Sequence, residues 1–307
     1  MDRADPLSAT PEPPDRVNYA TGVLLNAEDF EAEQLYHRGR LARALAYLHG
    51  SGTVAGLRVE WQRPLNPGDD PQLPAGREEG LVVQPGIAID RLGRIVELQT
   101  PACIRLDRWY RGQPADALIE ALHPRTPPLP DDPYGGVVVD LFIRFHACER
   151  GKTPAFAAGP FDALDAVVAS RLRDAYRLEL VLRPEDAPPQ PRSRWPDGSA
   201  IADAPTRAAT LRSAIYDAWR EGTDSWNDDG PLPLPEHAPG QNPTAIFLAR
   251  LVLPATAEID DLGRPTRTAG EDVTIQDEAR PFVYPTDLLA QLAGLIQGYP
   301  LPEEGDG

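Results

Sequence analysis

Residues 26–50 read NAEDFEAEQLYHRGRLARALAYLHG, and this stretch predicts the longest element of the fold. Asn26 is a residue type that caps helix N-termini, and Asp29 stands three positions later, in the place of a capping box. Gly50 suits the left-handed position that follows a helix. We therefore expect a helix over residues 27–49.

The apolar side chains of this helix gather along one side. At about 100° per residue, that side holds Ala27 and then six further residues. The six are Phe30, Gln34, His37, Leu41, Leu45 and Leu48. We expect an amphipathic helix whose stripe packs on something larger, and these six residues are the predicted interface. Gln34 and His37 are interpreted as a polar spot that fixes the register by hydrogen bonding to a neighbour, in preference to a catalytic role for His37.

The rest of the chain favours strands. Alternating or β-branched apolar runs predict strands, and the Asp-Arg-Leu-Gly sequence at 90–93 predicts a hairpin turn. Strands are expected at 53–61, 80–98 (as a hairpin), 137–146, 176–182, 244–253 and 273–275, and shorter helices at 115–122, 206–221 and 286–297. The predicted fold class is α+β, β-rich with antiparallel hairpins, one long N-terminal amphipathic helix and two or more shorter helices.

Proline-rich segments indicate where the chain divides. Five prolines between residues 124 and 133 mark the strongest candidate boundary. We expect a flexible arm at 1–16, a helix plus β-hairpin domain at 17–123, a linker at 124–133, a second β-rich domain with helices at 134–300 and a flexible tail at 301–307. At this level, 17–123 and 134–300 fit either two domains or one sheet system.

A short sequence occurs twice. Ile-Asp-Arg-Leu-Gly-Arg at 89–94 returns as Ile-Asp-Asp-Leu-Gly-Arg at 259–264. Two explanations fit. The first is a duplicated hairpin. The second is independent use of an Asp-x-x-Gly turn, whose chemistry demands the same residues wherever it occurs.

The charge balance argues against two classes of partner. Lys and Arg total 30 and Asp and Glu total 47, so the net charge is −17. Nucleic acids and anionic membrane surfaces attract basic residues, so we expect neither as a partner. The chain has no apolar run long enough to span a bilayer and no signal-peptide pattern at its start. Its two cysteines, Cys103 and Cys148, form no disulfide framework, and we expect synthesis in the cytoplasm.

Motifs for catalysis are scarce. The sequence contains neither GxSxG nor HExxH, and acidic pairs such as Asp228-Asp229 and Asp260-Asp261 are interpreted as solvated residues of glycine-containing turns, so we expect no enzyme, no cofactor and no metal. His146 and Cys148 are the one cluster of metal-ligand types, because residues two apart on a strand share a face. A structural zinc site needs four ligands, and no second pair stands at a recognisable spacing, so packing is the favoured interpretation.

Longer strings in the N-terminal third point to a family. They are YATGVLL at 19–25, AEDF at 27–30, EQLY at 33–36, LHGSGTVAGL at 48–57 and VVQPGIAID at 82–90. This region, roughly residues 17–98, resembles a little-characterised family encoded with the baseplate and sheath components of phage-tail-like (extracellular) contractile injection systems. The resemblance implies a particle component and supplies no catalytic residues. Around Cys148 the chain lacks the additional cysteines that the family pattern leads us to expect, so no cysteine-linked role is implied.

The expected function is that of a non-enzymatic structural component of such a particle, at the baseplate periphery, in a fibre or fibre adaptor, or as a cap. Its partners would be the other subunits of the particle, with the chain either in a homo-oligomer or in symmetric copies, and the chain would be extracellular only as part of a released particle. The alternative is a module that binds a cell surface or glycan through loops on a β-scaffold, with Trp195 and Trp226 stacking on sugars. An enzyme or a delivered toxin is the less favoured third hypothesis.

Overall fold

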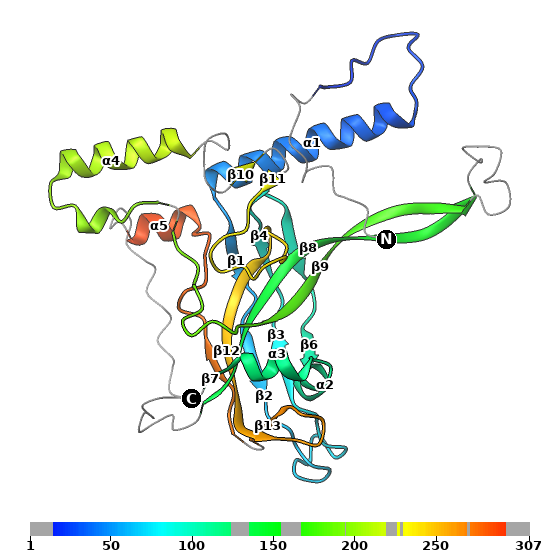
Figure 1. Ribbon diagram of the computed structural model, residues 1–307. Coiled ribbons are helices and arrows are strands. Elements are labelled where there is room, and N and C mark those ends of the chain that lie inside the picture. Colours follow the sequence, from blue (N-terminus) through cyan, green and yellow to red (C-terminus); the bar gives the residue numbers. More distant parts are fainter. Residues whose placement is uncertain are drawn as a thin grey trace, which may run out of the picture.

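A long helix lies along one edge of a β-rich body in the computed structural model (Figure 1), which describes residues 15–123, 135–154, 167–193, 195–218, 226–227, 230–268 and 271–292. Within these ranges, the helices are α1 (Ala27–Leu48), α2 (Leu106–Arg111), α3 (Ala115–Glu120), α4 (Ala204–Asp217) and α5 (Thr286–Leu292), with a 3-10 turn at Gly198–Ala200. The first strands are β1 (Gly52–Gly56), β2 (Val59–Gln62), β3 (Gly80–Val83), β4 (Gly86–Ile89), β5 (Ile95–Leu98), β6 (Ala102–Arg105) and β7 (Leu122–His123). The later strands are β8 (Gly136–Pro154), β9 (Val167–Leu182), β10 (Trp226–Asn227), β11 (Gly230–Pro231), β12 (Ile246–Ile259), β13 (Pro265–Arg267) and β14 (Thr274–Gln276).

These strands pair in antiparallel sheets. The largest runs in the order β13-β12-β8-β7, with β14 also on β12 and β9 also on β8. Two three-stranded sheets follow the orders β1-β4-β5 and β2-β3-β6, and β10 pairs with β11. The described residues therefore confirm a mixed fold with antiparallel sheets and more strand than helix, as the sequence pattern predicts.

The main hydrophobic core draws on both halves of the chain. β8 and β12 form its centre, and Val139 stands opposite Leu251 in their register. Both side chains are fully buried, and they share the cluster with Leu81 of β3 and Leu118 of α3. The predicted linker 124–133 and the predicted tail 301–307 fall outside the described residues, and so does the predicted arm 1–16 up to residue 14.

The prediction of one continuous strand over residues 53–61 is wrong. The run 53–61 forms two strands in different sheets, because the chain turns sharply at Gly56 and Leu57. Leu57 has φ 56°, a left-handed conformation that costs a side-chain-bearing residue roughly 1–2 kcal/mol. Its side chain is completely buried, which stabilises the fold by about 1.5–3 kcal/mol and offsets that cost.

The repeated sequence forms the same turn twice. Asp90 Oδ1 accepts from the N–H groups of Leu92 and Arg94, each at 2.9 Å, and Arg94 Nε donates to Asp90 Oδ2 at 2.7 Å. In the second copy, Asp260 makes the corresponding bonds to Leu262 and Arg264, at 2.9, 2.9 and 3.0 Å. Each turn closes a hairpin, β4–β5 and β12–β13. Both explanations of the repeat, a duplicated hairpin and independent use of the turn, lead to the two turns that the structure shows.

A buried ion cluster crosses the largest sheet. Asp140 on β8 is inaccessible to solvent and receives Arg250 Nε at 2.8 Å, Arg250 Nη2 at 2.9 Å and Arg183 Nη1 at 3.0 Å. Arg250 also donates to the carbonyl oxygens of Pro188 and Pro189. The cluster therefore attaches the start of the proline-rich loop after β9 to the sheet.

Strands β8 and β9 continue well beyond the body as a two-stranded ribbon (Figure 1). β12 pairs with β8 only between Gly136 and Ile143, so the outer part of β8 pairs with β9 alone. Residues 149–153 and 170–174 are exposed on this ribbon. The predicted strands 137–146 and 176–182 capture only its inner half.

Candidate docking surface

Helix α1 begins and ends where local chemistry predicts. Asn26 Oδ1 accepts from the Asp29 N–H at 3.0 Å, and the Asn26 N–H donates to Asp29 Oδ2 at 2.8 Å, which is the expected capping box. Gly50, after the helix, has φ 80° in the left-handed region. The helix is 22 residues long.

Small residues attach α1 to the body. Ala42 and Ala46 are the buried residues of the helix. The β4–β5 turn reaches the helix at Gly93, where a Cβ atom would lie 1.7 Å from the Ala42 carbonyl oxygen. Gly93 therefore serves two purposes, because its φ of 82° and its close approach to the helix both exclude a side chain.

The predicted interface residues lie on the opposite side of α1, which we call the outer face. Phe30, Leu41 and Leu48 are 53%, 56% and 77% exposed. Gln34 and His37 are also exposed, and Leu45 is half-buried. The structure thus brings the six residues together on one side of the helix without placing them in its own core. The amphipathic character predicted for α1 is not confirmed, because the packed side uses alanines instead of large apolar residues.

His37 interacts within its own helix. Its Nε2 lies 2.8 Å from Glu33 Oε1, one turn earlier, and its ring meets the Tyr36 ring edge-on at 5.4 Å. The segment before the helix also exposes apolar side chains, because Val23 and Leu24 are 54% and 95% exposed. Exposed apolar side chains of this kind are suited to contact with another macromolecule.

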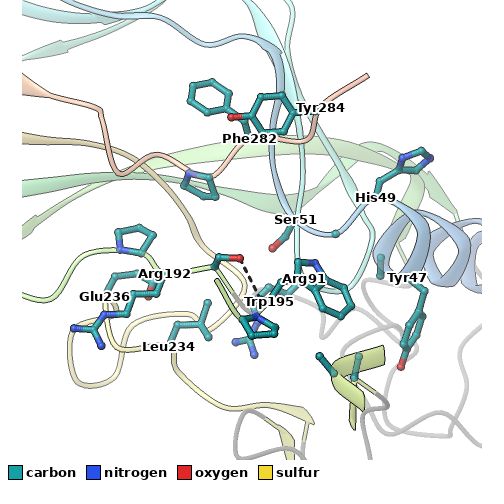
Figure 2. Close-up of a pocket in the computed structure, with 18 of the residues that line it drawn as sticks. Tyr47, His49, Ser51, Arg91, Arg192, Trp195, Leu234, Glu236, Phe282 and Tyr284 are labelled. Carbon is teal, nitrogen blue, oxygen red and sulfur yellow. Dashed lines mark hydrogen bonds between the residues drawn. The ribbon is translucent and has the colours of Figure 1, made fainter. Parts of the chain in front are cut away.

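A pocket of about 1070 Å³ lies at the C-terminal end of α1. Figure 2 shows Trp195 among its lining residues, with Phe282 and Tyr284 on one side and Tyr47 and His49 from the end of α1 on another. Trp195 is 39% exposed, and its backbone N–H donates to Ser193 Oγ at 3.1 Å. Aromatic rings around a polar opening are typical of sites that stack ring-shaped ligands.

Burial shifts the pKa of several charged groups around this pocket. Desolvation raises the pKa of Glu236 above its usual value and lowers the pKa values of the Arg91 and Arg280 guanidinium groups. Arg280 donates to the carbonyl oxygens of Leu248 at 2.6 Å and Leu57 at 2.9 Å. These contacts indicate that Arg280 holds the pocket wall against the body, because its donors point to backbone carbonyls.

The other candidate residues lie on strands β8 and β10. The backbone of Trp226 lies in β10, paired with Pro231, and its side chain lies outside the described residues. His146 and Cys148 lie on the same strand, β8, opposite Ala175 and Arg173 of β9. Among the described residues, no group of three or more metal-ligand side chains comes together.

Comparisons with known proteins add no family to this description. A scan against protein-family models finds no match, and a search of curated proteins finds no relative. Each helix in the described ranges is too short or too polar to cross a membrane.

Sequence reasoning missed most of the pocket. Its walls come from the end of α1, the loop around Trp195, helix α4, the segment around Leu234 and the segment 279–284. Polar surroundings mark Trp195 in the sequence, but nothing local marks Arg280 or Glu236. Their roles arise from contacts with residues distant in the sequence.

Proposed function

We propose that this chain is a non-enzymatic structural component of a phage-tail-like contractile injection particle, at the baseplate periphery, in a fibre or fibre adaptor, or as a cap. It acts by docking on other subunits, in symmetric copies. In this proposal it is made and assembled in the cytoplasm and leaves the cell only within a released particle.

The observation that carries the proposal is the outer face of α1. Phe30, Leu41 and Leu48 are large apolar side chains that are each more than half exposed on the side of the helix that faces away from the body, with Gln34 and His37 between the first two. Single exposed apolar residues are ordinary, and what supports the proposal is that several of them share one face of one helix.

The β8–β9 ribbon supports the same proposal. Two-stranded ribbons are only marginally stable alone in water. Arg150 stands directly opposite Arg171, and Lys152 follows two residues later on the same exposed stretch. Like charges opposite each other are unfavourable, and an acidic neighbouring subunit would relieve them.

The test is co-sedimentation with assembled particles. Leu41→Glu places a charge in the outer face and is expected to abolish co-sedimentation with sheath and tube. Ile215→Glu is the matched control, because Ile215 is a 63% exposed apolar residue on a different helix, α4. If wild-type protein never sediments with sheath and tube, or if both variants behave alike, the proposal fails.

The Trp195 pocket favours one alternative, a cell-surface or glycan-binding module. Trp195 is partly exposed and lines the same opening as Phe282 and Tyr284, and this opening is large enough for a sugar unit. Trp195→Ala should then remove binding on a glycan array, whereas Tyr216→Ala, at an exposed aromatic residue outside the pocket lining, should keep it. An array without any hits would refute this alternative.

A further inference from the structure

The outer part of the β8–β9 ribbon has one basic side. Arg150 on β8 stands directly opposite Arg171 on β9. Lys152 lies two positions from Arg150, and Arg173 lies two positions from Arg171. Paired residues of an antiparallel ribbon share a face, and so do residues two apart along a strand. The four exposed cations therefore lie on one side of the ribbon, which we call the basic face.

The acidic residues of the same part of the ribbon lie on its other side. Glu149 and Asp174 each stand next to a residue of the basic face in the sequence, so their side chains point the opposite way. Closer to the body, Arg144 is neutralised by an ion pair with Glu179. The outer cations lack such a partner, because within the described ranges none of the four side chains forms a hydrogen bond or an ion pair.

The rest of the molecule carries the complementary charge, since the whole chain has a net charge of −17. Several exposed carboxylates outside the ribbon also have no hydrogen bond or ion pair with any described residue. They are Glu97, Glu120, Glu258, Asp261 and Glu278. The ribbon extends away from the body (Figure 1), so its outer cations and these carboxylates are not joined within one copy.

We infer that the basic face of the ribbon docks on the acidic body of a second copy of this chain. The inference rests on the proposed function, since it names the subunit that the ribbon contacts. Two basic faces would repel each other, so the ribbon of one copy must meet a different surface of the other copy. Such contacts can be exchanged within a two-fold pair or repeated around a ring.

A nucleic acid fits the basic face less well. Duplex DNA carries one negative charge per about 1.7 Å of its length, and four cations would have to hold a chain of net charge −17 against that density. The body of a second copy, in contrast, carries arginines among its carboxylates, so it opposes the approach less strongly.

The single lysine of the chain provides a direct test, because Lys152 lies on the basic face. At low salt, a carbodiimide couples a lysine amine to a carboxylate in contact with it. The experiment mixes unlabelled wild type with isotope-labelled Lys152→Arg, which keeps the charge but lacks the amine. Mass spectrometry should then find unlabelled Lys152 peptides joined to labelled acidic peptides from outside the ribbon.

Sedimentation equilibrium of the full chain measures the strength of the contact. Wild type should self-associate at low salt and less at high salt, because the Debye length falls from about 10 Å in 0.1 M salt to about 3 Å in 1 M salt. The double variant R150E/R171E should weaken the association about tenfold, because attractive contacts become repulsive. It keeps like charges opposite each other in the ribbon, so the repulsion within the ribbon is unchanged.

Arg212→Glu is the matched control, because Arg212 is an exposed arginine on α4 that forms no ion pair with any described residue. It should associate like wild type, and circular dichroism checks that each variant is folded. The inference would be overturned by a wild-type monomer at every concentration, by lysine cross-links within single chains only, or by equal weakening in Arg212→Glu. A chain that stays monomeric and binds duplex DNA would overturn it as well.

This outcome is separable from that of the proposed function. A monomeric chain that still co-sediments with particles would refute the ribbon contact and leave the proposed function standing. A chain that forms the expected cross-links but never joins a particle would do the reverse.

Discussion

Replacing Gly93 by alanine should loosen the attachment of α1 to the body. A Cβ atom at this position would lie 1.7 Å from the Ala42 oxygen and 2.5 Å from the Ala42 carbonyl carbon, whereas ordinary contacts begin at 3.4 Å. The β4–β5 turn and the helix must therefore move apart. Because Ala42 and Ala46 are the buried residues of α1, little else in the helix resists that movement.

The second copy of the turn supplies the control. Gly263 has φ 77°, close to the 82° of Gly93, but a Cβ there would meet only the Ala115 Cβ at 3.9 Å. Gly263→Ala should cost roughly 1–2 kcal/mol for its left-handed backbone. Gly93→Ala should cost a further 1–3 kcal/mol or so, typical of overpacking. The difference between the two variants is the contribution of the helix contact.

Urea unfolding followed by circular dichroism measures both free energies. Hydrogen exchange of the amides in α1 reports the attachment directly, and it should become faster in the Gly93 variant alone. Equal destabilisation of the two variants, with α1 exchange unchanged in both, would refute the reasoning.

Three further predictions concern buried groups. Asp140→Asn removes the buried carboxylate that Arg250 and Arg183 share, while Arg183 keeps its contacts with Glu185. The change should lower the free energy of unfolding, measured in urea, by about 3–5 kcal/mol, against about 0–1 kcal/mol for Glu185→Gln, whose side chain is 40% exposed. Burial lowers the pKa of His237, whose Nδ1 accepts a hydrogen bond from the Leu234 N–H. As the pH falls below 6.5, the unfolded state therefore takes up a proton before the folded state does, and the free energy of unfolding should decrease. This decrease should be less steep in His237→Gln. Burial raises the pKa of Tyr110 to about 12, so the free energy of unfolding should decrease as the pH rises above 10. In an ultraviolet titration, the Tyr110→Phe variant should lose the absorbance change of the tyrosine that ionises at the highest pH.

Helix α1 and the turns at Asp90 and Asp260 could be predicted because their stabilising interactions are local in the sequence. Asn26, Asp29 and Gly50 are capping residues whose interactions lie within a few positions of each other, and sequence spacing alone places them. The same holds for Asp90 and Asp260, each of which binds backbone N–H groups two and four residues later.

Other features of the fold could not be predicted from the sequence pattern, because they depend on packing between residues that are distant in the sequence. The break at Leu57 depends on a left-handed residue that is retained because its side chain fills the core. The outer ribbon lacks the apolar alternation of a buried strand, so its pairing was not predicted. The predicted helix 206–221 corresponds to α4, and its apolar residues Leu211 and Ile215 are exposed. Helical periodicity predicts which residues share the outer face of α1. Which side of the helix meets the body depends on the close contact at Gly93.

The ribbon has a mechanical consequence. β8 is one unbroken strand whose inner residues, Gly136–Ile143, are hydrogen-bonded to β12 in the middle of the core. A pull on the outer end is therefore carried along the strand into the central sheet, where it acts as shear on the β8–β12 hydrogen bonds. The inner end of the ribbon lies in the hydrophobic core. Force applied to its outer end is therefore resisted by the hydrogen bonds and packing of the core.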